Sequence, residues 1–123
     1  MSDNVDHPAH YAGRDGVNFE CIELTQFQNF CVGNAMKYLW RFRSKGKPLE
    51  DLRKARWYAR RASRLGEVVL HAAGSCDRIL RALYESTTGF ESVAWHGFYT
   101  RDWHMVIEAL DRMIERVENG EEI

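Results

Sequence analysis

The residues of this chain that are best suited to chemistry are basic, and most of them lie close together. Residues 34–64 contain eleven of the seventeen lysines and arginines and only two acids, which gives this segment a net charge of +9. Residues 1–33 carry a net charge of −4 and residues 65–123 one of −6, so the chain sums to −1. A cationic block inside a nearly neutral chain indicates either a solvated surface or a site that binds anions.

Helical spacing arranges the polar residues of this block in two rows. At about 100° per residue, each row lies roughly a quarter turn from the apolar stripe of its expected helix: Asn34, Lys37 and Arg41 in the first, and Asp51, Lys54, Tyr58 and Arg61 in the second. When two antiparallel helices pack stripe against stripe, rows displaced in the same sense lie on one side of the pair. Cations at the border of a core bind anions better than cations on an open face, because the local dielectric is lower. We therefore predict a basic groove for a phosphate-bearing nucleotide, with a plain solvated surface as the alternative for the first row.

Two helices must position these rows. The first is predicted from about residue 17 or 19, with Gly33 as its weak point, and it has one buried stripe made of Leu24, Phe27, Cys31, Ala35, Tyr38 and Phe42. The second begins at Pro48, ends near Leu65 with Gly66 as its stop, and has a stripe that is mostly alanine. Its remaining cations are predicted to be a solvated face: Arg53, Arg56, Arg60 and Arg64.

The other periodic segments complete an all-α protein. Helical patterns run over residues 69–83 and 103–117, and an aromatic connector lies between them. We predict one domain, residues 1–123, folded as a small helical bundle of about four helices built on an antiparallel helical hairpin. It consists of an extended N-terminal arm (1–16), the hairpin (17–65) and C-terminal helices (66–123).

Composition excludes several classes of protein. No run approaches the roughly 18 apolar residues that cross a bilayer, and residues 1–6 are polar and acidic, so we expect a soluble, cytoplasmic protein without a membrane partner. Three widely spaced cysteines predict reduced, buried thiols, and a structural zinc site has little support.

The arm and the first helix suggest further contacts. His7 and His10, beside Tyr11, are expected either to fold over the groove as a lid that contacts a base or phosphate, or to be ordinary surface histidines. Met36 and Trp40 make the first helix apolar on a second side, which predicts burial between other helices or between subunits. A homo-oligomer follows from the second alternative, with the groove completed by another subunit.

Five sequence blocks resemble a known family. They are NVDHPAHY at residues 4–11, ECI at 20–22, FCVGNAMKYLWR at 30–41, KGKP at 45–48 and EDLRKARWY at 50–58. In order and spacing they are similar to the phage-associated "domain of unknown function 3310" family, also labelled SaV-like. The resemblance implies a phage or prophage origin and a role in the cytoplasm of the infected bacterial host. It also implies kinship with a phage nucleotide kinase that acts on nucleoside monophosphates without a Gly-rich phosphate loop.

Residue chemistry and resemblance together predict a nucleotide-binding protein that catalyses phosphoryl transfer like a nucleoside monophosphate kinase. The alternatives are a non-catalytic binder that sequesters a nucleotide and, less favoured, a nucleic-acid-binding accessory protein. We expect no permanent cofactor and no protein-bound metal, with magnesium arriving only with the nucleotide. The predicted catalytic residues are His10 and Asp51. The predicted substrate- and phosphate-binding residues are His7, Tyr11, Asn34, Lys37, Tyr38, Arg41, Lys45, Lys54, Tyr58 and Arg61.

Overall fold

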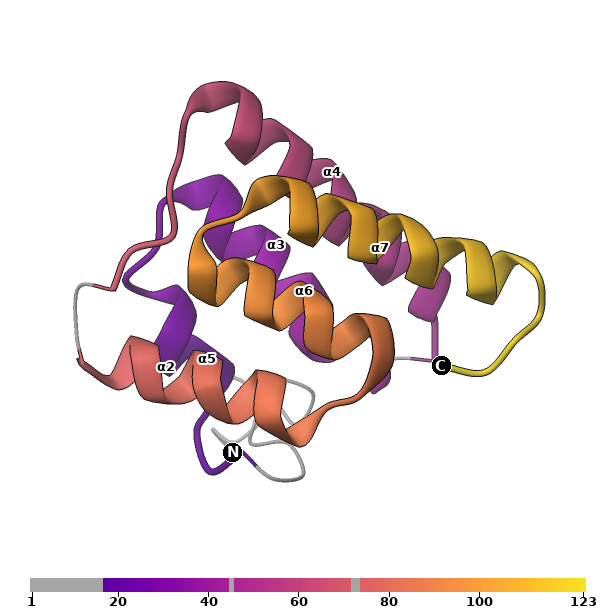
Figure 1. Ribbon diagram of the computed structural model, residues 1–123, viewed down its shortest axis with the longest axis horizontal. Helices are drawn as coiled ribbons and strands as arrows, with labels where there is room; N and C mark the ends of the chain where they lie inside the picture. The colour runs from indigo at the N-terminus through magenta and orange to yellow at the C-terminus, as the bar shows by residue number, and fades with distance from the viewer. Residues whose placement is uncertain (1–16, 45, 72–73) are drawn as a thin grey trace, which may run out of the picture.

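The computed structural model describes residues 17–44, 46–71 and 74–123, and these residues form helices without a β-strand. The helices are α2 (Cys21–Thr25), α3 (Phe30–Arg41), α4 (Pro48–Leu65), α5 (Gly74–Ser86), α6 (Gly89–Thr100) and α7 (Trp103–Glu118). In Figure 1, α4 and α7 run side by side along one edge of the molecule, α6 lies in front of α3, and α5 forms the opposite edge. The predicted all-α class is confirmed, with six helices in the described part of the chain where about four were expected.

The first predicted helix is in fact two helices. α2 ends at Thr25 and α3 begins at Phe30, so the break precedes Gly33, which lies inside α3. Phe27 belongs to the turn between them and is 37% exposed, so its predicted place in a buried stripe is wrong. The segment predicted as an aromatic connector between two helices forms a helix of its own, α6.

Contacts with a distant segment explain why α3 starts where it does. The carboxylate of Glu67 accepts a hydrogen bond of 3.0 Å from the backbone N–H of Val32, one of the N–H groups that a helix start leaves without an intrahelical partner. The side chain of Gln28 both donates to and accepts from the backbone of Leu70, at 2.8 Å each. Residues 67–70 therefore cap α3 as an extended segment, and the third predicted helix begins only at Gly74.

The α3–α4 hairpin follows the sequence signals closely. Pro48 occupies the first turn of α4, Glu50 and Asp51 lie at its positive end, and Gly66 ends it with a left-handed φ of 75°. The predicted stripe of α4 is fully buried at every position: Leu52, Ala55, Ala59 and Ala62. Because three of the four are alanines, the backbones of the two helices can approach closely.

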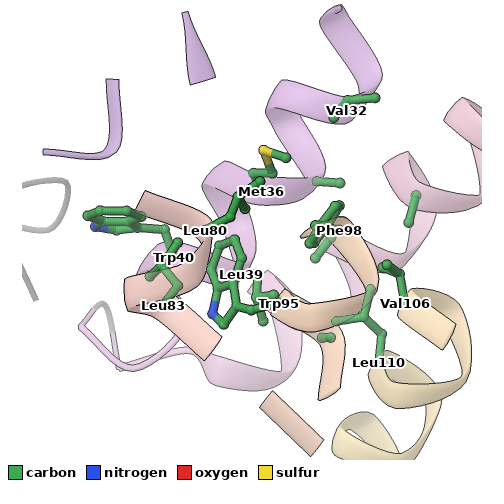
Figure 2. Packing of buried hydrophobic residues seen from close by; sticks show 14 of the residues in the cluster. Val32, Met36, Leu39, Trp40, Leu80, Leu83, Trp95, Phe98, Val106 and Leu110 are labelled. Carbon is green, nitrogen blue, oxygen red and sulfur yellow. The ribbon is translucent and has the colours of Figure 1, made fainter. Parts of the chain in front are cut away.

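The opposite side of α3 is covered by the same chain. Met36 is completely buried and Trp40 is 3% exposed. Figure 2 shows Met36, Leu39 and Trp40 among side chains of α5 and α6, such as Leu80 and Trp95. The second apolar side of α3 is therefore used inside the bundle, and it gives no support for the predicted interface between subunits.

Ion pairs join α4 to α7, which run alongside each other. Arg53 contacts Glu118 at 2.7 Å, Arg56 contacts Asp111 at 3.0 Å, and Arg60 contacts Asp111 at 3.5 Å. Three of the four arginines predicted as a purely solvated face thus pair with α7, although exposed pairs contribute only about 0–1 kcal/mol each. No helix in the described residues is both long and apolar enough to span a bilayer.

A close approach of backbones fixes α6 against α7. A Cβ atom added at Gly97 would lie 2.7 Å from Cγ2 and 3.0 Å from the backbone nitrogen of Val106. Arg101, with a φ of 60°, ends α6, and the side chain of Asp102 caps α7 by accepting a hydrogen bond from the N–H of Met105.

Substitution of two glycines by alanine should therefore have opposite effects. Gly97→Ala should lower the free energy of unfolding by about 1–3 kcal/mol, because the new methyl group overlaps α7. Gly33→Ala places its Cβ in ordinary contact at 3.4 Å and should raise the free energy of unfolding by roughly 0.5–1 kcal/mol through helix propensity. Urea denaturation of both variants measures the difference. A neutral Gly97→Ala would contradict the close packing of α6 on α7.

Candidate functional site

Three cations gather around the ring of Tyr38 on the α3–α4 hairpin. The Nζ atom of Lys37 lies 4.6 Å from the ring centroid, the guanidinium carbon of Arg41 5.2 Å and the Nζ atom of Lys54 5.3 Å. Lys37 and Arg41 belong to α3, whereas Lys54 belongs to α4. The two predicted rows of polar residues therefore meet on one side of the hairpin, with the face of Tyr38 partly offsetting the mutual repulsion of the cations.

A second tyrosine extends this aromatic centre. The rings of Tyr38 and Tyr58 stack with a centroid distance of 6.0 Å and an angle of 8° between their planes. We call these two residues the tyrosine pair. Phe30 and Trp57 contact Tyr58 edge to face at 5.9 Å and 5.0 Å, and both are mostly exposed, at 72% and 56%. Large exposed rings beside a cation cluster are the features that bind flat aromatic ligands carrying negative charge.

Asp51 lies beneath this surface. Its side chain is 1% exposed, and its two oxygens accept contacts of 3.3–3.4 Å from Nε and Nη2 of Arg41, which is itself 14% exposed. Because the pair is desolvated, its attraction is stronger than that of an ion pair in water. The carboxylate predicted to be catalytic is therefore situated to orient Arg41, and it does not face the open groove.

The two lysines are more accessible to an anion. Lys37 has no acidic partner among the described residues. Lys54 contacts Glu50 at 3.4 Å, but the two side chains are 44% and 53% exposed, and such a pair is weak. A phosphate group with two negative charges could replace Glu50 at Lys54 and also reach Lys37.

Two hollows adjoin the tyrosine pair. The first, with a volume of about 390 Å³, has Phe30 and Lys37 in its wall together with polar residues of the α2–α3 turn and α3: Thr25, Gln28, Asn29, Gly33 and Asn34. The second, of about 700 Å³, has Trp57 and Lys54 in its wall and is otherwise lined by Gly46, Lys47, Pro48, Leu49, Glu50, Arg53 and Val117. We call them the Phe30 hollow and the Trp57 hollow. Both hollows are shallow and largely open to solvent.

Two other predicted site residues lie at the margin. Asn34 lines the Phe30 hollow and donates its side-chain N–H to the carbonyl of Phe30 at 2.8 Å. Arg61 is exposed, makes no ring contact with Tyr38, and acts instead on Cys31 near the start of α3. Arg61 lies about one helical turn beyond Tyr58, and this places it past the cluster.

The surroundings of Cys31 disfavour its thiolate form. Burial raises the pKa of its thiol, and the neighbouring carboxylate of Glu67 raises it further, while the charge of Arg61 opposes this weakly. A raised pKa keeps the thiol protonated at neutral pH. Its free, buried state agrees with the prediction of reduced thiols.

The predicted residues His7, His10, Tyr11 and Lys45 lie outside the described residues. Within the described ranges, no three histidine, cysteine or acidic side chains cluster as a metal site would require. The buried pairing of Asp51 with Arg41 also makes it a poor ligand for magnesium.

Phe30 as a wall of the site was not predicted from the sequence. The sequence does contain a signal for its exposure, because Phe30 follows the polar Asn29 and lies outside the apolar stripe of the predicted helix. An aromatic residue outside that stripe is exposed unless another element covers it. The sequence predicts binding roles for Tyr38 and Tyr58, but their stacking and the contact of Phe30 with Tyr58 arise only in three dimensions.

Comparison with known proteins gives one match. No curated protein and no solved structure matches the chain. The model of a family described as a protein of unknown function, DUF3310, matches residues 5–60, which include α2, α3, the turn after α3 and most of α4. The matched segment contains the tyrosine pair and the three cations described around Tyr38. Residues 5–60 therefore belong to the DUF3310 family, and the candidate site lies within the part of the chain that defines it.

Proposed function

We propose that this protein binds a nucleotide in the α3–α4 groove, with the phosphates held by Lys37, Arg41 and Lys54. The observation that carries the proposal is the convergence of these three cations on one tyrosine ring. Among the described residues, the buried Asp51 pairs with Arg41 and the exposed Glu50 pairs with Lys54. An unliganded cluster of this kind is under electrostatic repulsion, and an anion relieves it.

Phosphoryl transfer to a nucleoside monophosphate is the first activity that we propose for this site. The acceptor in that reaction is a phosphate oxygen that is largely ionised at neutral pH, so transfer depends on positioning and charge neutralisation more than on a general base. A groove with several cations and a buried, structural Asp51 suits that requirement. Sequestration without turnover is the second candidate, favoured by the lack of a metal-binding acid cluster in the described residues.

An assay with purified protein separates these activities. The protein is incubated with ATP, Mg²⁺ and a panel of nucleoside monophosphates, while diphosphate formation and thermal stability are both followed. Formation of ADP and a nucleoside diphosphate in equal amounts supports the kinase. A thermal shift without product supports sequestration, and the absence of both effects for every nucleotide would overturn the proposal.

Removing either lysine should weaken nucleotide binding without harming the fold. Lys37→Met and Lys54→Met should each lower affinity about 10-fold, because each removes a charge-assisted contact to phosphate. In the absence of ligand, Lys37→Met should raise Tm by about 1–2 °C through relief of repulsion. Calorimetric titration and thermal melts measure both effects. The matched control is Arg64→Met, which removes an exposed α4 cation that makes no contact with Tyr38 and should leave affinity unchanged.

Replacement of Asp51 distinguishes a positioning role from a catalytic one. Asp51→Asn should lower the free energy of unfolding by about 3 kcal/mol, because it removes a fully buried carboxylate from its ion pair with the largely buried guanidinium of Arg41. The control Glu50→Gln, one residue earlier and exposed, should change stability by less than about 0.5 kcal/mol. An Asp51→Asn protein that keeps its stability and its nucleotide affinity but loses turnover would show instead that Asp51 acts in the chemical step.

A further inference from the structure

The two hollows beside the tyrosine pair differ in most of their lining but share two features. Each has one largely exposed aromatic ring, Phe30 or Trp57, and each has one lysine of the cation cluster, Lys37 or Lys54. The Phe30 hollow borders α3 on its α2 side, whereas the Trp57 hollow borders α4 on the side where Val117 of α7 lies. The site therefore has two separate platforms and not one.

The cations connect these platforms. Lys37 and Lys54 lie on different helices, yet both ammonium groups are near the same Tyr38 ring, at 4.6 Å and 5.3 Å from its centroid. Their separation can be no larger than the sum of those two distances. Because lysine side chains are flexible, an anion bound between the two ammonium groups can draw in a lysine from each hollow, and Arg41, at 5.2 Å from the ring, adds a third charge.

A ligand with one base leaves one platform unused. Phe30 and Trp57 both contact the ring of Tyr58, but they line different hollows, so a base in one hollow leaves the ring of the other uncovered. Proteins that bind single-stranded nucleotides commonly splay successive bases onto separate aromatic rings while cations hold the backbone between them. Exposure of two large rings within one charged surface fits this pattern better than it fits isolated surface residues.

Building on the proposed function, we propose that the ligand of this site is a dinucleotide unit. Its central phosphodiester lies over Tyr38 between Lys37 and Lys54, one base stacks on Phe30, and the other stacks on Trp57. The same chemistry is present in a free dinucleotide and in two successive residues of a single strand.

The test is a set of calorimetric titrations of the full-length protein in the adenine and thymine series. Each series comprises the nucleoside 5′-monophosphate, the dinucleoside monophosphate with a 5′-phosphate, and a twelve-residue single strand. We expect the dinucleotide to bind at least 10-fold more tightly than the mononucleotide, because a second stacked base contributes about 1–3 kcal/mol. If the strand binds more tightly than the dinucleotide at equal nucleotide concentration, the ligand is single-stranded nucleic acid. If the strand and the dinucleotide bind with equal affinity, the ligand is a free dinucleotide.

Variants locate the two bases. Phe30→Ala and Trp57→Ala should each reduce dinucleotide affinity about 10-fold, while only one of them should affect the mononucleotide. Both side chains are exposed, so the fold should survive, and Phe90→Ala is the matched control because Phe90 is a 38% exposed ring on α6 outside both hollows. Two results would overturn this inference but leave the proposed function intact. The first is equal affinity for the mononucleotide and the dinucleotide. The second is a dinucleotide affinity that does not change in Phe30→Ala or in Trp57→Ala. Absence of binding by all three probes overturns this inference, and the proposed function also fails if the full panel of nucleoside monophosphates has no effect.

Discussion

The buried ion pair between Arg41 and Asp51 is the constraint on which the candidate site depends. It joins the last residue of α3 to the first turn of α4, and it is almost fully removed from water. At the other end of the hairpin, the carboxylate of Glu67 caps the start of α3 through the N–H of Val32. With both ends fixed, α3 cannot slide or rotate against α4, and the stacking of Tyr38 on Tyr58 follows from that register.

The basic segment serves three physical purposes that its composition cannot separate. Arg53, Arg56 and Arg60 pair with acids of α7 and attach the hairpin to the C-terminal helices. Arg41 and Arg43 pair with the buried acids Asp51 and Glu91, the second of which also accepts a hydrogen bond from Trp95 at 3.2 Å. Lys37 and Lys54 remain partly exposed at the surface. Lysine suits that position, because its ammonium group is a mobile point charge that can follow a ligand, whereas arginine holds fixed, forked contacts with carboxylates.

Small residues allow the bundle to close around α3. The alanines of α4 permit close packing on one side, and Gly97 permits the approach of α6 to α7 on the other. Between these layers α3 presents Met36, Leu39 and Trp40 to the core (Figure 2). The apolar character of α3 on two sides is thus a requirement of a central helix, and the polar row with Lys37 and Arg41 occupies what remains of its surface.

The sequence by itself determined the helical class, the alanine stripe of α4 and the side of the hairpin on which the polar rows lie, because these depend on local periodicity. It also determined both ends of α4, because these depend on Pro48 and Gly66. Tertiary structure decided the rest. The break before α3 depends on Glu67 and Gln28 reaching across more than thirty residues of chain, and no local pattern encodes such a contact. The burial of Asp51, the pairing of α4 with α7 and the meeting of Phe30 with Trp57 around Tyr58 likewise arise only when separate helices pack. Spacing within a helix gives the direction of a side chain, but the neighbour that it meets is set by the packing of the whole chain.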